Sequence, residues 1–305
     1  MHRNRIVRER QSSDTAVYLN LGCGSRYHPQ WINIDIAVHA REVIQHDLSC
    51  GIPLPDSSCE VVYHSAVLEH LRPSDAAALM AECWRVLRPG GIVRAGVPDL
   101  ERICEVYLSK LKGAQNGDEA AADDYDWIML ELIDQIQREK SGGEMLAYLQ
   151  QDPLPNEAFV YERIGEEGRQ LVKALRNCPL HQRRETSSGG SFVAFVHRLR
   201  TGPRRQPGAA KRRTLEWLLG VDDKRALEIG RFRLAGEVHQ WMYDRYSLAR
   251  LLGRAGFVDP RPQAAGTSQI PNWTSFHLDT LPDGQVIKPD LFFMEAIRPG
   301  GHVHD

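Results

Sequence analysis

The stretch Val17–Asp35, VYLNLGCGSRYHPQWINID, constrains the fold more than any other part of the chain. An apolar, β-prone run breaks at Gly22 and Gly24, and a second such run ends at Asp35. Glycine at such a break permits either a tight turn with positive φ or a close approach of the backbone to a ligand. Ligands of open α/β sheets bind beyond the carboxyl ends of strands, and an acid ending the second strand commonly accepts hydrogen bonds from ribose hydroxyls. The pattern therefore predicts two neighbouring parallel strands that hold an adenosine-type ligand.

The dinucleotide-binding pattern GxGxxG is not completed in this stretch. Its third glycine would fall on Tyr27, and Asp35 follows the turn sooner than the usual spacing of about 20 residues. Nicotinamide and flavin cofactors are therefore disfavoured.

The next segments show the alternation of strands and helices that is typical of a parallel sheet. Residues 43–48, 60–65 and 92–97 are β-prone, and a helix is expected over 75–87, where apolar residues recur at helical spacing before the stop signal RPGG. Strand, helix and strand with short connections predict parallel strand pairing.

These motifs together resemble a known family. LNLGCG, the strand-ending Asp35, HDL at 46–48, PDSSCEVVYHSAVLEHL and RVLRPGGIVRAGVPDL are similar, in order, to class I S-adenosylmethionine-dependent methyltransferases of the type 11 group. Relatives with WINID as the second strand occur in bacterial polysaccharide and secondary pathways. The resemblance implies an α/β fold: a Rossmann-like, mostly parallel sheet with the last strand antiparallel, here carrying a helical insertion.

The same resemblance implies a cofactor site for S-adenosylmethionine. Gly22 and Gly24 would pass under the methionyl part, Asp35 would bind the ribose, and Asp47 with Leu48 would frame the adenine. The complete implied set is Asn20, Gly22, Cys23, Gly24, Asp35, Asp47, Leu48, His64 and Ser65. Two departures predict a less charged and more open pocket: Asn20 stands where the family usually has an acid, and the connection from Gly24 to Trp31 is too short for the usual helix.

Four segments are expected along the chain. They are a flexible basic tail (1–15), a cofactor-binding core (16–100), a mainly helical insertion or substrate lid (101–236), and the C-terminal part of the core (237–305). Helices are expected over 100–111, 127–137, 145–149 and 169–176 and from about Ser247, loops over 112–118, 186–191 and 268–273, and strands over 258–262 and 291–297. Loop 268–273 is expected near the active-site face.

Within the insertion, residues 197–213 form a concentrated basic tract, HRLRTGPRRQPGAAKRR. A solvated loop is the first interpretation, because charge runs are usually surface. Binding of a phosphate-bearing substrate comes second, and an anionic membrane surface or RNA third, since interleaved aromatics are missing.

Methyl transfer to a hydroxyl needs a base, and His239, just before WMYDR, is the first candidate. A packing or capping histidine is the alternative interpretation. Asp244 could orient His239 or cap the following helix. Asp99, at a strand end, is a second candidate base, with capping as its alternative.

Other polar and aromatic residues near these motifs have open roles. Glu69 and His70 face either the cofactor or the core, and Trp241 and Tyr243 either stack on a sugar or belong to the core. No metal is predicted, because the histidines lack a ligand spacing such as HExxH and the six cysteines lack CxxC pairs.

The net charge and the composition of the chain limit the partners that we expect for it. A net charge of −2 argues against global capture by nucleic acid, the sequence contains no transmembrane segment, and the scattered cysteines suit a reducing cytoplasm. The function expected is O-methylation of a sugar, glycan or other polar small molecule. A non-catalytic methyltransferase-like scaffold and an RNA methyltransferase are the alternatives, and the oligomeric state, including a homodimer, is left open.

Overall fold

The structure is a computed structural model that describes residues 16–38, 40–177 and 220–300. Within them a seven-stranded sheet has the order β3-β2-β1-β4-β5-β7-β6. Its strands are β1 Tyr18–Leu21, β2 Ile32–Asp35, β3 Val43–Gln45, β4 Cys59–Ser65, β5 Leu87–Pro98, β6 Val258–Gln263 and β7 Leu291–Ile297. The first five strands pair in parallel, and β7 lies antiparallel between β5 and β6. The predicted fold class is confirmed. The tail 1–15, the loop 186–191 and the basic tract 197–213 lie outside the described residues.

One face of the sheet is covered by two helices, α2 Pro73–Val86 and α11 Arg245–Arg254. Their apolar stripes, including Met80 and Leu248, pack on aliphatic side chains of the central strands to form the largest core. Both helices were expected, and their amphipathic spacing explains why they lie flat on the sheet.

The opposite face is covered by the connection between β6 and β7, which contains only a short helix, η3 Trp273–Phe276, as regular helical structure. Trp31, Tyr63 and Trp273 are buried there and meet edge-on or tilted, with ring centroids 5.2–6.1 Å apart. Segment 268–273, expected near the active-site face, packs on this aromatic layer. We call the two sides the helical face and the aromatic face.

A buried arginine holds the connection on the aromatic face. Arg94 of β5 is fully buried and forms ion pairs with Asp279 (2.9 Å) and Glu295 (2.8 Å). Its remaining donors reach the carbonyls of residues 264, 265 and 267, and its guanidinium lies over the rings of Trp273 and Phe293. A buried charge is tolerated when it is paired and hydrogen-bonded, as it is here.

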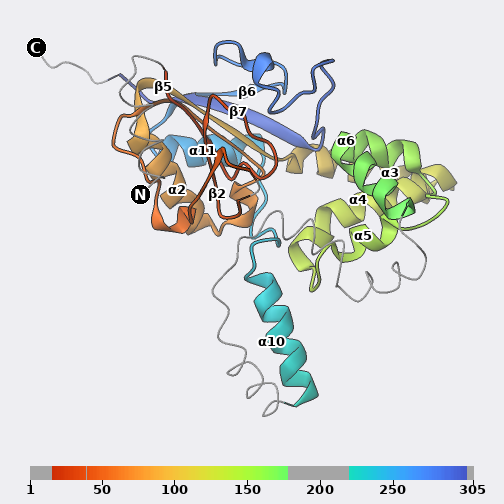
Figure 1. Cartoon of the computed structure of the whole chain (residues 1–305). Helices are drawn as coiled ribbons and strands as arrows, with labels where there is room; N and C mark the ends of the chain where they lie inside the picture. Colours follow the sequence, from red (N-terminus) through yellow and green to blue (C-terminus); the bar gives the residue numbers. More distant parts are fainter. Residues whose placement is uncertain (1–15, 39, 178–219, 301–305) are drawn as a thin grey trace, which may run out of the picture.

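The insertion is helical in its described part. It comprises α3 Leu100–Gln115, α4 Glu119–Gln137, α5 Gly143–Leu149, α6 Glu157–Arg176 and α10 Val221–Arg233. Helices α3–α6 gather beside one end of the sheet, and α10 extends away from both (Figure 1). Helices α4, α5 and α6 share a core around Trp127, whereas α3 packs on α4 in a separate cluster that includes Ile103 and Ile128. No helix in the described residues is long and apolar enough to cross a membrane. The division into four segments remains a prediction.

Two sequence expectations about element boundaries were wrong. The loop expected over 112–118 is mostly the end of α3, because Gly113 packs against α4: a Cβ at that position would lie 2.6 Å from the Cβ of Ala121. RPGG follows the end of α2 as expected, since that helix stops at Val86, but the strand expected from residue 92 already begins at Leu87 and includes this motif. Its glycines serve a strand irregularity, since a Cβ on Gly91 would meet the carbonyls of Arg88 and Glu60 at 2.9 and 3.0 Å.

The insertion docks against the core through α6. At Gly165 the helix is interrupted with φ 62°, and a Cβ there would lie 2.5 Å from the carbonyl oxygen of Ile287. Close by, Glu167 forms ion pairs with Lys288 (3.7 Å) and with Arg26 of the β1–β2 connection (3.4 Å). The insertion is thereby tied to the carboxyl edge of the sheet.

Candidate functional site

The turn after β1 contains two glycines, and the structure requires or permits glycine at each for a different reason. Both have positive φ, 61° for Gly22 and 51° for Gly24. A Cβ on Gly22 would lie 2.5 Å from Cγ2 of Val67, so this glycine permits the turn to pack on the segment after β4. Around a Cβ on Gly24 there would be no heavy atom within 4 Å among the described residues. A ligand therefore has room to approach the backbone at Gly24.

Asp35 ends β2 beside this turn and is 6% exposed. One carboxylate oxygen accepts from the Gly24 N–H and the other from the Ala37 N–H, each at 2.8 Å. A carboxylate offers about four lone-pair positions, so each oxygen can accept one more hydrogen bond. The side chain fixes the turn and can still receive the two hydroxyls of a ribose.

Asn20 has a structural task that the sequence did not reveal. It is buried, and its amide nitrogen donates to the carbonyl of Arg26 and to the side chain of Asn33, its neighbour across β1 and β2. Asn33 in turn donates to the carbonyls of His28 and Trp31. The two side-chain amides donate hydrogen bonds to carbonyl groups of the β1–β2 loop, which stands in place of the usual helix between these strands. Asn20 thus points toward the loop, and a role in cofactor binding stays a prediction.

The other implied cofactor residues have distinct environments. Asp47 is exposed and caps the short helix η1 Leu48–Cys50 by accepting from the Ser49 N–H, while Leu48 is half-buried against the core. Cys23 is buried, and burial, with the nearby Asp35 carboxylate, raises the pKa of its thiol to about 12. It is therefore a neutral packing group.

His64 and Ser65 were expected to face the cofactor together. Adjacent strand residues project to opposite faces, so His64 lies with Val62 toward the helical face and Ser65 with Tyr63 toward the aromatic face. His64 is fully buried, and burial lowers its pKa to about 4. Its ring nitrogens have no hydrogen-bond partner among the described residues.

Asp99 and Asp244 both cap helices. Asp99 accepts from the Arg102 N–H at the start of α3, and its carboxylate is paired by both terminal nitrogens of Arg245. Asp244 accepts from the Ser247 N–H at 2.6 Å in a capping box that starts α11. The capping interpretation describes the observed contacts of both residues, and a catalytic role for either stays a prediction.

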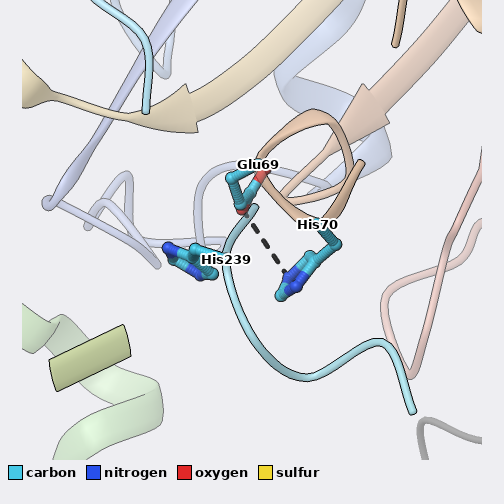
Figure 2. Close-up of side chains that lie close together, drawn as sticks. All are labelled: Glu69, His70 and His239. Atoms are coloured by element: carbon cyan, nitrogen blue, oxygen red, sulfur yellow. Dashed lines mark ion pairs between the residues drawn. The ribbon is translucent and has the colours of Figure 1, made fainter. Parts of the chain in front are cut away.

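His239 meets two residues from a distant part of the sequence. Glu69 and His70 lie on the short helix η2 Leu68–His70 just after β4, and His239 lies on the segment before α11. One ligand atom from each of the three lies within 4.8 Å of the others (Figure 2). The rings of His70 and His239 meet edge-on, with their centroids 4.8 Å apart. Glu69 and His239 are buried, and the His70 side chain is 24% exposed.

The sequence did not predict this convergence, because it depends on contacts between segments far apart in the chain. A signal was present in the adjacent Glu69 and His70 at a strand end, but nothing in the spacing connects them with His239. Of the two aromatic residues nearby, Trp241 is half-exposed, whereas Tyr243 is buried in the core. Because Tyr243 is 3% exposed, its ring does not belong to an exposed sugar-stacking surface. Burial and the Glu69 carboxylate raise the Tyr243 pKa to about 12.

Part of the chain is similar to known proteins. Residues 19–95 match the family model described as a methyltransferase domain. A probable S-adenosylmethionine-dependent methyltransferase of Mycolicibacterium smegmatis is 43% identical over 63 residues, which cover 21% of this chain and 24% of that protein. One from Mycobacterium tuberculosis is 43% identical over 58 residues, covering 19% of this chain and 20% of that protein. The chain thus spans about a quarter of the length of the curated relatives it matches.

Solved structures show more distant similarity. A methyltransferase from Methanosarcina mazei is 14% identical with a TM-score of 0.35, covering 97% of this chain and 98% of that one. A second, from Mesorhizobium loti, is 20% identical with a TM-score of 0.23, covering 31% of this chain and 52% of that one.

Residues 19–95 thus resemble a methyltransferase domain, and the strand order and the glycine turn with its acid agree with the fold of class I S-adenosylmethionine-dependent methyltransferases. S-adenosylmethionine is the cofactor of this class. The residues present fit it, because the open space at Gly24 and the remaining acceptor positions of Asp35 suit an aminoacyl chain and a ribose, respectively.

Proposed function

We propose that the chain is an S-adenosylmethionine-dependent O-methyltransferase whose acceptor is a sugar or another polar small molecule. The observation that carries this proposal is the position of the Glu69–His70–His239 cluster relative to the cofactor turn. Val67, two residues before Glu69, touches the Gly22 turn. His70 therefore lies on the segment that borders the place where the methyl group is expected, and the His239 ring meets the His70 ring.

The chemistry needs alignment and the removal of one proton. S-adenosylmethionine supplies a methyl group on a sulfonium, and the acceptor oxygen takes that methyl in an in-line displacement that leaves a neutral thioether. In the proposal, Asp35 and the Gly24 turn orient the ribose and the aminoacyl chain, and His239 accepts the proton of the acceptor hydroxyl. Positioning and proton removal are the contributions of the protein, because the sulfonium already activates the methyl.

The helical insertion supports a small polar acceptor. Its helices α3–α6 are docked at the carboxyl edge of the sheet through Gly165 and Glu167. Insertions at this edge are where specificity is usually built. Buried ion pairs on the insertion, such as Arg163 with Glu131 at 2.5 Å, keep it a defined structure that can enclose a polar molecule.

Cofactor binding is tested by substituting Asp35. We expect Asp35→Ala to weaken S-adenosylmethionine binding at least tenfold, about 1.4 kcal/mol, because the ribose loses a charged acceptor. Isothermal titration calorimetry measures this, with Asp56→Ala as an exposed control and circular dichroism as a check of folding. Unchanged affinity in folded Asp35→Ala would remove the assignment.

The base is tested separately. His239→Ala should lower turnover and leave cofactor affinity intact, with reactions in cell extracts followed by mass spectrometry for a gain of one methyl group. Normal turnover of this variant across pH would exclude His239 as the base.

The scaffold alternative depended on Asn20 standing in place of an acid. Because the Asn20 amide supports the β1–β2 loop, its presence has a structural explanation that does not require loss of the cofactor. Thermal shift separates the two functions, since a ligand at 100 times its dissociation constant adds about 2.7 kcal/mol of stability. Absence of a shift with S-adenosylmethionine and with its demethylated product would favour the scaffold.

A further inference from the structure

The backbone holds Glu69, His70 and His239 together independently of their side chains. The carbonyl of Glu69 accepts from the N–H groups of Gln240 (2.6 Å) and Trp241 (3.2 Å), and the N–H of His239 donates to the carbonyl of Gln135 in α4. Leu68 and Val238, the residues that precede Glu69 and His239, are fully buried. The cluster is therefore built on three fixed parts of the fold: the end of β4, the segment before α11, and the insertion.

The donor set is that of a transition-metal site. Two imidazoles and one carboxylate are the three protein ligands of many catalytic zinc centres, which keep a further position open. Imidazole nitrogen favours zinc, cobalt, iron or copper over magnesium or calcium.

The spacing is close to that of a coordinated site. Ligand atoms about 2.1 Å from a tetrahedral zinc ion lie about 3.4 Å from one another. The three ligand atoms lie within 4.8 Å, and the His70 Nε2 to Glu69 Oε1 distance is 4.0 Å. Figure 2 shows the three side chains close together, and the His70 side chain, at 24% exposure, is the most accessible of them.

We propose that Glu69, His70 and His239 bind one divalent transition-metal ion, of the zinc type, with an open coordination position beside the cofactor turn. This departs from the absence of metal expected from the sequence. The open position would take an acceptor oxygen, whose hydroxyl proton then leaves to water because metal coordination lowers its pKa. His239 would then serve as a ligand in place of a base. This catalytic consequence rests on the proposed function, whereas cation binding does not.

The test uses the full chain, freed of metal with a chelator and titrated with Co²⁺, whose visible absorption reports coordination geometry. We expect one equivalent to bind with the spectrum of a four- or five-coordinate site. Binding should weaken at least tenfold in Glu69→Gln, His70→Ala and His239→Ala. His277→Asn is the matched control, because His277 is exposed, lies outside the cluster, and has a left-handed backbone conformation that asparagine tolerates. Equal weakening in the control, or no binding above that of the three variants, would overturn the site.

A second measurement needs no substitution and remains decisive if a variant fails to fold. Diethyl pyrocarbonate modifies accessible imidazoles, and peptide mass spectrometry locates the modification. Because His70 is the accessible imidazole of the cluster, Zn²⁺ should protect His70 in the wild-type chain and leave the exposed His277 unprotected. Equal modification of His70 with and without Zn²⁺ contradicts the proposal. Both experiments are read without cofactor or acceptor, so a failure of the proposed methyl transfer would not affect them.

Discussion

The two faces of the sheet are covered by different means. The helical face uses two amphipathic helices and an aliphatic core, whereas the aromatic face uses an irregular connection, rings in edge-on and tilted contact, and the buried Arg94 network. An irregular segment must find partners for its backbone groups when it covers a sheet. Arg94 supplies three of them, by donating to the carbonyls of residues 264, 265 and 267.

This difference explains why the chain can omit a helix between β1 and β2. Trp31 and Tyr18, which lie in or beside these strands, are covered by Trp273 and Phe276 from the far end of the sequence. The sheet surface left by the missing helix is closed over Trp31, which is 2% exposed. The more open cofactor pocket expected from the sequence stays a prediction. A stabilising cover can thus come from a segment remote in the chain.

The largest expected effect on stability comes from a substitution on the aromatic face. Arg94→Met should lower the free energy of unfolding by about 3–5 kcal/mol, because Asp279 and Glu295 are left buried without their cation. Urea denaturation followed by tryptophan fluorescence measures it. Arg88→Met on the same strand removes an exposed ion pair with Glu60 and should cost less than about 1 kcal/mol. Similar losses for the two variants would mean that the buried network does not hold this face.

The second prediction concerns His64 on the helical face. Its folded-state pKa of about 4 lies below the ordinary value of 6.5, so the unfolded chain binds the proton more readily. Stability is therefore complete above pH 6.5 and is lost as the pH falls toward 4, by about 2 kcal/mol between pH 7 and pH 5. Urea denaturation at several pH values measures this. His64→Gln should remove that part of the slope; an unchanged slope would show that His64 is not the titrating group.

The smallest expected effect on stability concerns the Asn20 amide that supports the β1–β2 loop. Asn20→Ala removes two hydrogen bonds and should destabilise the fold by about 1–2 kcal/mol. S-adenosylmethionine affinity, measured by calorimetry, should change less than it does in Asp35→Ala. A larger loss of affinity in Asn20→Ala would indicate that this amide contacts the cofactor directly.

Much of the fold was predictable because its signals are local. The strands around Gly22 and Asp35, the helix α2 and the antiparallel β7 each follow from periodicity or from family motifs confined to short segments. Helix boundaries were less predictable, since Gly113 reads as a loop residue in the sequence and serves helix packing in the structure.

The candidate site was only half predictable. Asp35 and Gly24 lie together as expected, because neighbouring parallel strands end at the same edge. The meeting of His239 with Glu69 and His70, and the coverage of Trp31 by Trp273, depend on tertiary contacts that no local pattern encodes.

The position of β7 has a consequence for how the chain is made. β5 pairs along β7 from Ile92 to Pro98, yet β7 follows the entire insertion and the C-terminal helix in the sequence. During synthesis, the edge of β5 that pairs with β7 therefore stays without its partner until β7 has been made. Unpaired strand edges promote aggregation of folding intermediates. The helical insertion thus lengthens the time during which a nascent chain exposes that edge.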